Sequence, residues 1–141
     1  MNQVSNFSVL VVNDEWDDMK ATAAVLRGIN GSVALEPIFV ATGRSALRLA
    51  SAGYVPDLLL IDLAQDGELT GVGVIRALWE VIGEEVPAAV VAPGLISGSI
   101  PSSIKVLHKP LSTATAFIRA WIRSLDLEKS AQEMPSLPAT Q

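Results

Sequence analysis

Acidic and amide side chains, together with one lysine, follow three of the apolar runs in this sequence. Asn13 and Asp14 come after FSVLVV, Asp62 comes after DLLLI, and Lys109 follows IKVLH. Crowded carboxylates repel each other unless a cation lies between them. Mg²⁺ binds one or two carboxylates and keeps several waters, and a lysine ammonium can hold a phosphoryl oxygen as a compact charge. This combination predicts transfer of a phosphoryl group onto a carboxylate, with the metal and the lysine neutralising the transferred group.

The elements that must position these residues are apolar runs alternating with segments of helical periodicity. The expected strands are 7–12, 33–40, 57–61, 86–91 and 104–107, and Pro37 indicates that the second lies at an edge. The expected helices are 16–28, 43–52, 75–82 and 114–125. The alternation predicts an α/β fold whose parallel sheet has helices on both faces. Ligands bind beyond the carboxyl ends of such strands, where the acidic residues are expected.

Three details of the helices can be checked. The first helix places Trp16, Met19, Ala23 and Leu26 on one stripe, and the last places Ala114, Phe117, Ile118, Trp121, Ile122 and Leu125 on another. Ser112 is the expected N-cap of the last helix. The interval PGLISGSIPSS has no helical stripe, which predicts a turn or a mobile loop in place of a full fourth helix. The polar tail 126–141 lacks periodicity and is expected to be disordered, so the folded domain is 1–125.

Composition excludes several classes of protein. The 141 residues are about one domain's worth, 50% are apolar and 18% are charged, so the body of the chain is not disordered. There is no cysteine, and His108 is the single histidine, which excludes disulfides and multi-histidine metal sites. The formal net charge of −5 argues against nucleic acid as a partner. No signal peptide and no membrane span are evident, which predicts a small cytoplasmic domain.

The motifs VLVVNDE, ATGRSAL, PDLLLID and LHKP, in this order, resemble those of the receiver domain of two-component response regulators over residues 7–125. The resemblance implies a doubly wound, flavodoxin-like sheet of five parallel strands in the order 2-1-3-4-5. It implies that Asp62 is the phosphoacceptor, supplied by a sensor histidine kinase or a histidine phosphotransfer protein. Such a domain is not an enzyme beyond its own phosphotransfer and autodephosphorylation.

The resemblance also implies a ligand set. Mg²⁺ would be held by Asp14, Asp62, the backbone carbonyl of Ala64 and, through a water, Asn13. Lys109 would contact the phosphoryl group, and the peptide bond between Lys109 and Pro110 is cis in many receivers.

The chain departs from the receiver pattern at several positions. Asn13 replaces an acid, which predicts weaker Mg²⁺ binding. Ala92 stands where a hydroxyl moves onto the phosphoryl group, and Val106 stands where an aromatic side chain rotates inward. The loop AQDGELTG lacks the usual proline, and its acids Asp66 and Glu68 are expected to face solvent. The residues that the resemblance assigns to phosphoryl transfer are thus partly present, whereas the hydroxyl and aromatic residues of the switch are absent.

Three functions remain open at this point. A stand-alone receiver would signal through protein–protein interaction with a downstream protein, or serve as a phosphate sink or shuttle. A pseudo-receiver would be a phosphorylation-independent interaction module, in which replacing Asp62 leaves partner binding unchanged. A phosphatase with Asp62 as nucleophile would need an acid two residues later, where this chain has Ala64. Whether the chain forms a homodimer is also left open.

Overall fold

The computed structural model describes residues 5–27, 33–62, 71–92, 100–108 and 110–133. The strands are β1 (Ser5–Val12), β2 (Val33–Val40), β3 (Leu58–Asp62), β4 (Ala88–Ala92) and β5 (Ile104–His108). The helices are α1 (Trp16–Arg27), α2 (Gly43–Ser51), α3 (Gly71–Ile82) and α4 (Thr115–Glu133), with a 3₁₀ turn η1 (Leu111–Ala114) before α4. No helix in this described part of the chain is both long and apolar enough to cross a membrane.

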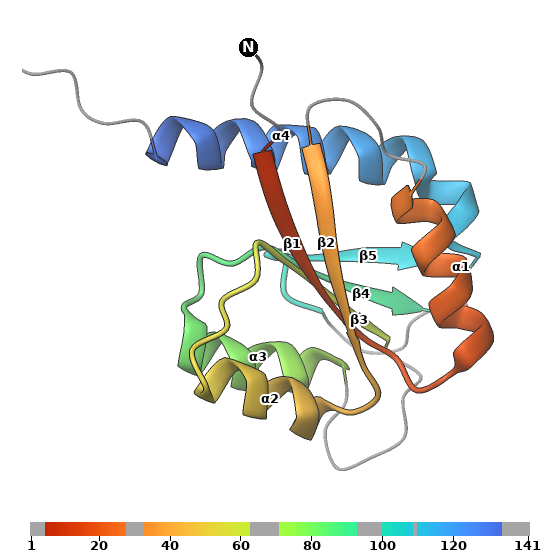
Figure 1. Ribbon diagram of the computed structural model, residues 1–141. Helices are drawn as coiled ribbons and strands as arrows, with labels where there is room; N and C mark the ends of the chain where they lie inside the picture. The colour runs from red at the N-terminus through yellow and green to blue at the C-terminus, as the bar shows by residue number, and fades with distance from the viewer. Residues whose placement is uncertain (1–4, 28–32, 63–70, 93–99, 109, 134–141) are drawn as a thin grey trace, which may run out of the picture.

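The five strands form one parallel sheet in the order β2-β1-β3-β4-β5 (Figure 1). The predicted fold class and strand order are therefore confirmed. Pro37 lies on β2, at the edge of the sheet, where one side of the strand needs no ladder hydrogen bond. The expected strand positions agree with the observed ones to within two residues.

Each face of the sheet carries its own apolar core. Helices α1 and α4 cover one face and α2 and α3 cover the other (Figure 1). Successive side chains of a strand point to opposite faces, so Val9 and Val11 belong to the first core and Leu10 and Val12 to the second. All five residues of β3 and of β4 are buried, which fits central strands covered on both sides.

Helices α2 and α3 approach closely where α2 begins. A Cβ atom added at Gly43 would lie 2.7 Å from Cγ2 of Val74, so any other residue here would force the Val74 side chain to move. Thr42 is the N-cap of α2, because its Oγ1 accepts a hydrogen bond from the Ser45 N–H at 3.1 Å. The motif ATGRSAL thus encodes a capped helix that packs tightly on its neighbour.

The start of the last helix differs from the prediction. Ser112 lies inside η1 and is not an N-cap, and the hydroxyl of Thr115 donates to the Ser112 carbonyl at 2.9 Å. Phe117, expected to point inward, is 46% exposed and stacks against Trp121 with 5.9 Å between ring centroids. Ile118 and Ile122, which belong to the same predicted stripe, are buried, so the stripe is confirmed at its centre and Phe117 lies at its exposed edge.

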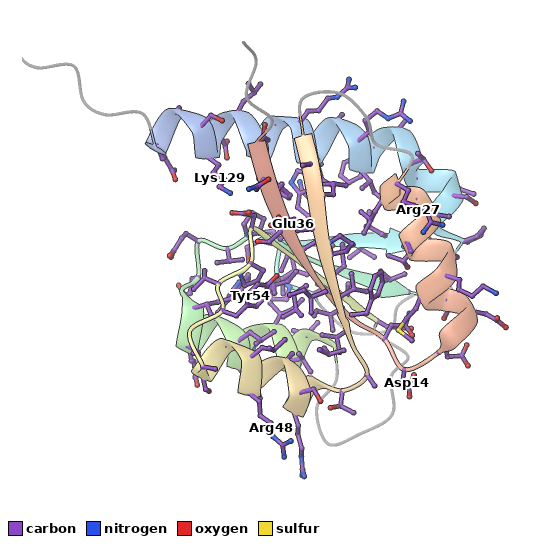
Figure 2. The ribbon with its side chains drawn as sticks, in the orientation of Figure 1. Asp14, Arg27, Glu36, Arg48, Tyr54 and Lys129 are labelled. Atoms are coloured by element: carbon purple, nitrogen blue, oxygen red, sulfur yellow. The ribbon has the colours of Figure 1, made fainter. Side chains whose placement is uncertain are left out.

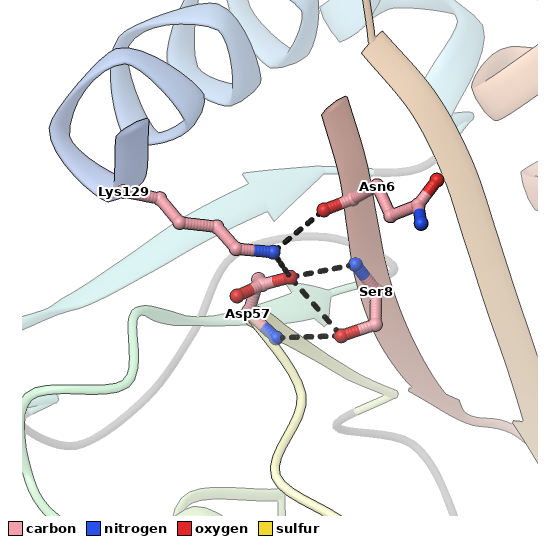
Figure 3. Close-up of polar contacts among 4 residues, drawn as sticks. All are labelled: Asn6, Ser8, Asp57 and Lys129. Carbon is pink, nitrogen blue, oxygen red and sulfur yellow. Dashed lines mark hydrogen bonds and ion pairs between the residues drawn. The ribbon is translucent and has the colours of Figure 1, made fainter. Parts of the chain in front are cut away.

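The expected disordered tail from 126 is wrong for residues 126–133, because α4 continues to Glu133. The Lys129 ammonium donates to the Asn6 carbonyl at 2.6 Å and pairs with the Asp57 carboxylate at 3.0 Å (Figure 3). The same Asp57 oxygen accepts from the N–H and the hydroxyl of Ser8. Polar contacts of Lys129 therefore hold residues 126–133 of α4 against the sheet in place of an apolar stripe. For this reason hydrophobic periodicity does not indicate that the helix continues. Residues 134–141 lie outside the described residues.

The interval after Ala92 was expected to be irregular. Residues 93–99 lie outside the described residues, whereas 100–103 form no helix and lead directly into β5.

Candidate functional site

The carboxyl ends of β1 and β3 bring two of the predicted site residues together. Val12 of β1 pairs with Ile61 of β3, so Asn13 and Asp62 follow at adjacent positions on neighbouring strands. Asn13 is 5% exposed and Asp62 is 4% exposed, and both line a hollow of about 350 Å³. The chain passes from β1 to β2 on one side and then returns to β3 on the other side of β1, so the sheet has a topological switch point between β1 and β3. Ligands of open α/β sheets bind at such a point.

Asn13 is fixed by two hydrogen bonds. Its backbone N–H donates to the Val40 carbonyl at 2.9 Å, which continues the pairing of β1 with β2. Its Oδ1 accepts the Glu15 N–H at 2.8 Å, an Asx turn that brings the chain into α1. The first helical hydrogen bond follows directly, from the Met19 N–H to the Glu15 carbonyl. Asn13 therefore orients the turn and presents its amide beside Asp62 at the same time.

Asp14 does not join Asn13 and Asp62 in the lining of the hollow. It is exposed, in the turn between β1 and α1, and Figure 2 shows it at the opposite end of the molecule from Lys129. Among the described residues there is no group of three or more histidine, cysteine or acidic side chains that could hold a metal ion. The lining thus offers the buried carboxylate of Asp62, the buried amide of Asn13 and the half-buried carboxylate of Asp18, with Asp14 exposed in the adjoining turn. That donor set fits a hard cation such as Mg²⁺, which binds through one or two carboxylates and keeps its waters.

Helix α1 contributes lining residues that the sequence analysis missed. Asp18 is half-buried and Thr22 is 5% exposed, and both line the hollow together with Val25. The predicted stripe through Met19, Ala23 and Leu26 is therefore rotated, because Thr22 and Val25 are buried whereas Met19 and Ala23 are only half-buried. Steps of four and three residues separate Asp18, Thr22 and Val25, which places them on one face of the helix. Hydrophobic periodicity does not indicate this face, because two of its three residues are polar.

The remaining predicted positions lie at the ends of β4 and β5 or outside the description. Ala92 is buried and pairs with His108, which is exposed and does not line the hollow. Val106 is half-buried against the core that faces α2 and α3. The other predicted positions lie outside the described residues: Ala64, Asp66, Glu68 and Lys109.

Comparison with known proteins identifies the fold. No family model matches the chain, and no curated protein is similar to it in sequence. Solved structures do match: a receiver domain (CheY-like) from Methylobacillus flagellatus has a TM-score of 0.67 at 18% identity, covering 86% of this chain and 99% of that one. A response regulator receiver protein from Sinorhizobium medicae has a TM-score of 0.70 at 18% identity, with 86% and 95% covered.

A third match is the Mn²⁺-bound form of the response regulator Rcp1, with a TM-score of 0.62 at 19% identity, covering 94% of this chain and 99% of that one. The chain therefore has the receiver fold over nearly its whole length. The fold that the four motifs implied is the fold observed.

Proposed function

We propose that this chain is a response regulator receiver that accepts a phosphoryl group on Asp62 from a histidine kinase or a histidine phosphotransfer protein. The observation that carries the proposal is the position of Asp62, buried beside Asn13 where β1 and β3 end, in a hollow open to solvent. Within the receiver fold, this is the edge of the sheet at which ligands bind. The chain then signals through a protein–protein interface.

The chemistry is a substitution at phosphorus. A carboxylate oxygen of Asp62 forms a bond to the phosphorus of a phosphohistidine while the phosphorus–nitrogen bond breaks, and the departing imidazole takes up a proton from solvent. The product is an acyl phosphate on Asp62. Burial of Asp62 and Asn13 removes bulk water from one side of the reacting carboxylate and holds it in one orientation.

Mg²⁺ would be held by Asp62, Asp14, the Ala64 carbonyl and, through a water, Asn13, and it would neutralise the charge of the phosphoryl group. Lys109 would hold a phosphoryl oxygen. Asn13 carries no charge, so the site binds Mg²⁺ more weakly than a site with a further carboxylate.

Readout of the modification cannot use a hydroxyl at Ala92 or an aromatic ring at Val106, because these residues have neither. The signal therefore leaves through Lys109 and the segment that follows β4.

The second candidate is a pseudo-receiver, an interaction module that is not phosphorylated. It is favoured by one specific observation, the exposure of Asp14 outside the lining of the hollow. In that case the buried pair of Asn13 and Asp62 serves the fold, and partner binding is independent of Asp62.

The two candidates are distinguished by intact mass after incubation with acetyl phosphate, with and without Mg²⁺. The receiver proposal expects a Mg²⁺-dependent gain of one phosphoryl group in the wild type and in Asp17→Ala, an exposed acid of α1 that serves as the control. Asp62→Ala should gain none. Absence of any gain in the wild type would support the pseudo-receiver.

A further inference from the structure

Helix α4 carries a second stripe of uncharged residues on the side that faces away from the sheet. Ile118 and Ile122 bury its inner side against the core. Five exposed residues follow one another on its outer side at steps of three and four, and we call them the outer stripe: Phe117, Ala120, Ser124, Leu127 and Ala131. Phe117 and Leu127 are 46% and 71% exposed. A surface helix normally turns charged residues to solvent, so α4 has the composition of a helix that is covered on two sides.

No described part of the chain covers the outer stripe. Helix α4 is the outer layer over one face of the sheet (Figure 1). Figure 2 shows Lys129 pointing from the inner side of α4 toward β1, where its ammonium donates to the Asn6 carbonyl. The charged residue that anchors the end of the helix therefore leaves the outer stripe free of charge. Burying such a surface against a partner is favourable.

The spacing of the outer stripe selects a second helix of the same kind as its partner. Steps of three, four, three and four residues are those of the a and d positions of two heptads, with Phe117 at a and Ala120 at d. Such a stripe packs on another stripe with the same spacing. A second copy of this chain presents one, and a two-fold axis along the two helices brings identical faces together.

The charges beside the outer stripe are complementary to themselves in one orientation. Arg123 occupies the g position on one side and Glu128 the e position on the other, and both are exposed. Neither has an ion pair with another residue of the described chain. In a parallel pair of helices, each g residue faces the e residue of the next heptad of the other helix. Arg123 of each copy then faces the partner's Glu128. In an antiparallel pair g faces g and e faces e, so the opposite charges would not meet.

We propose that the outer stripe is a homodimer interface, on which α4 of a second copy packs in parallel as a two-heptad coiled coil. Phe117 and Leu127 supply the apolar contact, and the small residues between and beyond them let the helices approach. The sheet already holds α4 as a helix, so association requires no folding. Two heptads make an interface smaller than the standard size, which gives a dissociation constant of about 10–100 µM. The pairing does not require phosphorylation of Asp62.

Sedimentation equilibrium of the whole chain, over concentrations on both sides of this dissociation constant, tests the proposal without Mg²⁺ or a phosphoryl donor. The wild type should pass from monomer to dimer. Leu127→Glu should weaken the dimer about tenfold or more, because a carboxylate in the interface loses its water. Val81→Glu makes the same change at an exposed residue of α3 and should have no effect. A chain that stays monomeric throughout would overturn the proposal in favour of a different protein as the partner, and a dimer unaffected by Leu127→Glu would overturn it as well.

Exchange of the flanking charges tests the parallel orientation. Arg123→Glu and Glu128→Arg should each weaken the dimer about fivefold, because each sets two pairs of like charges opposite one another. The double variant carries both changes and should dimerise like the wild type. Single variants that dimerise like the wild type, or a double variant that is weaker than both, would contradict the parallel pairing.

The chain has no cysteine, so an introduced one reports the contact directly. Ala131 lies at the end of the outer stripe, so Ala131→Cys meets its own equivalent only in a parallel pair. Under mild oxidation it should form a disulfide dimer at least about tenfold faster than Ala24→Cys, an exposed position of α1. Equal rates, or cross-linking of Ala131→Cys only with Phe117→Cys, would overturn the proposed arrangement. A chain that dimerises in this way but gains no phosphoryl group would separate this inference from the proposed function.

Discussion

The motif PDLLLID contains two aspartates, and the structure gives them different tasks at opposite ends of β3. Asp57 precedes the strand, and its Oδ2 accepts the Ser8 N–H at 2.8 Å, the Ser8 hydroxyl at 3.1 Å and the Lys129 ammonium at 3.0 Å (Figure 3). The Asp57 N–H donates to the Ser8 carbonyl at 2.8 Å, so the residue also continues the pairing of β1 with β3. We therefore predict that Asp57→Ala destabilises the fold, whereas Asp62→Ala removes the proposed chemistry.

The magnitude follows from these contacts. A hydrogen bond to a charged group contributes about 1.5–3 kcal/mol, and a partly exposed ion pair contributes about 0.2–1 kcal/mol. The side chains of Lys129 and Asp57 are 29% and 24% exposed. Solvent therefore screens the ion pair and the hydrogen bonds, and each contributes less than it would in the protein interior. Asp57→Ala, which also leaves the Ser8 N–H without its acceptor, should lower the free energy of unfolding by about 2–4 kcal/mol. Lys129→Met keeps the aliphatic stem and should cost only about 0.5–1 kcal/mol.

Urea denaturation followed by circular dichroism measures both effects, with Lys20→Met, an exposed lysine of α1, as the matched control. The double variant of Asp57 and Lys129 should lose less stability than the sum of the two single losses, because each single change removes the same ion pair. Two results would refute this reasoning: an Asp57→Ala protein as stable as the wild type, or a Lys129→Met protein destabilised as much as Asp57→Ala.

Three further predictions concern single residues. Thr42→Ala removes the N-cap of α2 and should cost about 1 kcal/mol in urea denaturation, whereas Thr42→Ser should restore most of it. Burial raises the pKa of the Tyr54 phenol above its ordinary value of 10.0, so the unfolded chain ionises first and the free energy of unfolding should fall as pH rises above 10.0. Tyr54→Phe should flatten this fall. Because Tyr54 is the single tyrosine, ultraviolet absorbance follows its ionisation directly. Asp126 is 6% exposed and its Oδ1 has no hydrogen-bond partner, so Asp126→Leu should raise the thermal midpoint, and a lowered midpoint would show that the carboxylate has a favourable role.

The sequence predicts those parts of the structure that depend on local pattern. The run from Leu58 to Ile61 is apolar at every position because β3 is covered on both faces, and Pro37 correctly indicates an edge strand. Asn13 and Asp62 could be placed together because parallel strands end at the same edge of the sheet. These inferences need only periodicity and topology.

The features that escaped prediction depend on contacts between distant segments. The end of α4 is held by Lys129 reaching Asn6 and Asp57, more than seventy residues away, so no local pattern reports it. The lining of the hollow by Asp18 and Thr22 likewise depends on how α1 is rotated against the sheet. Polar residues that are buried by tertiary packing are read as exposed when only hydrophobic periodicity is used.

The central claim is that Asp62 is the acceptor, and chemical trapping tests it most directly. The protein is incubated with acetyl phosphate and Mg²⁺, and borohydride then reduces any acyl phosphate to the alcohol, which converts the modified aspartate to homoserine. Peptide mass spectrometry identifies the position. The account predicts homoserine at position 62 and unmodified aspartate at 14 and 18. Homoserine at another acid, or at none while Mg²⁺ and the phosphoryl donor are present in excess, would contradict it.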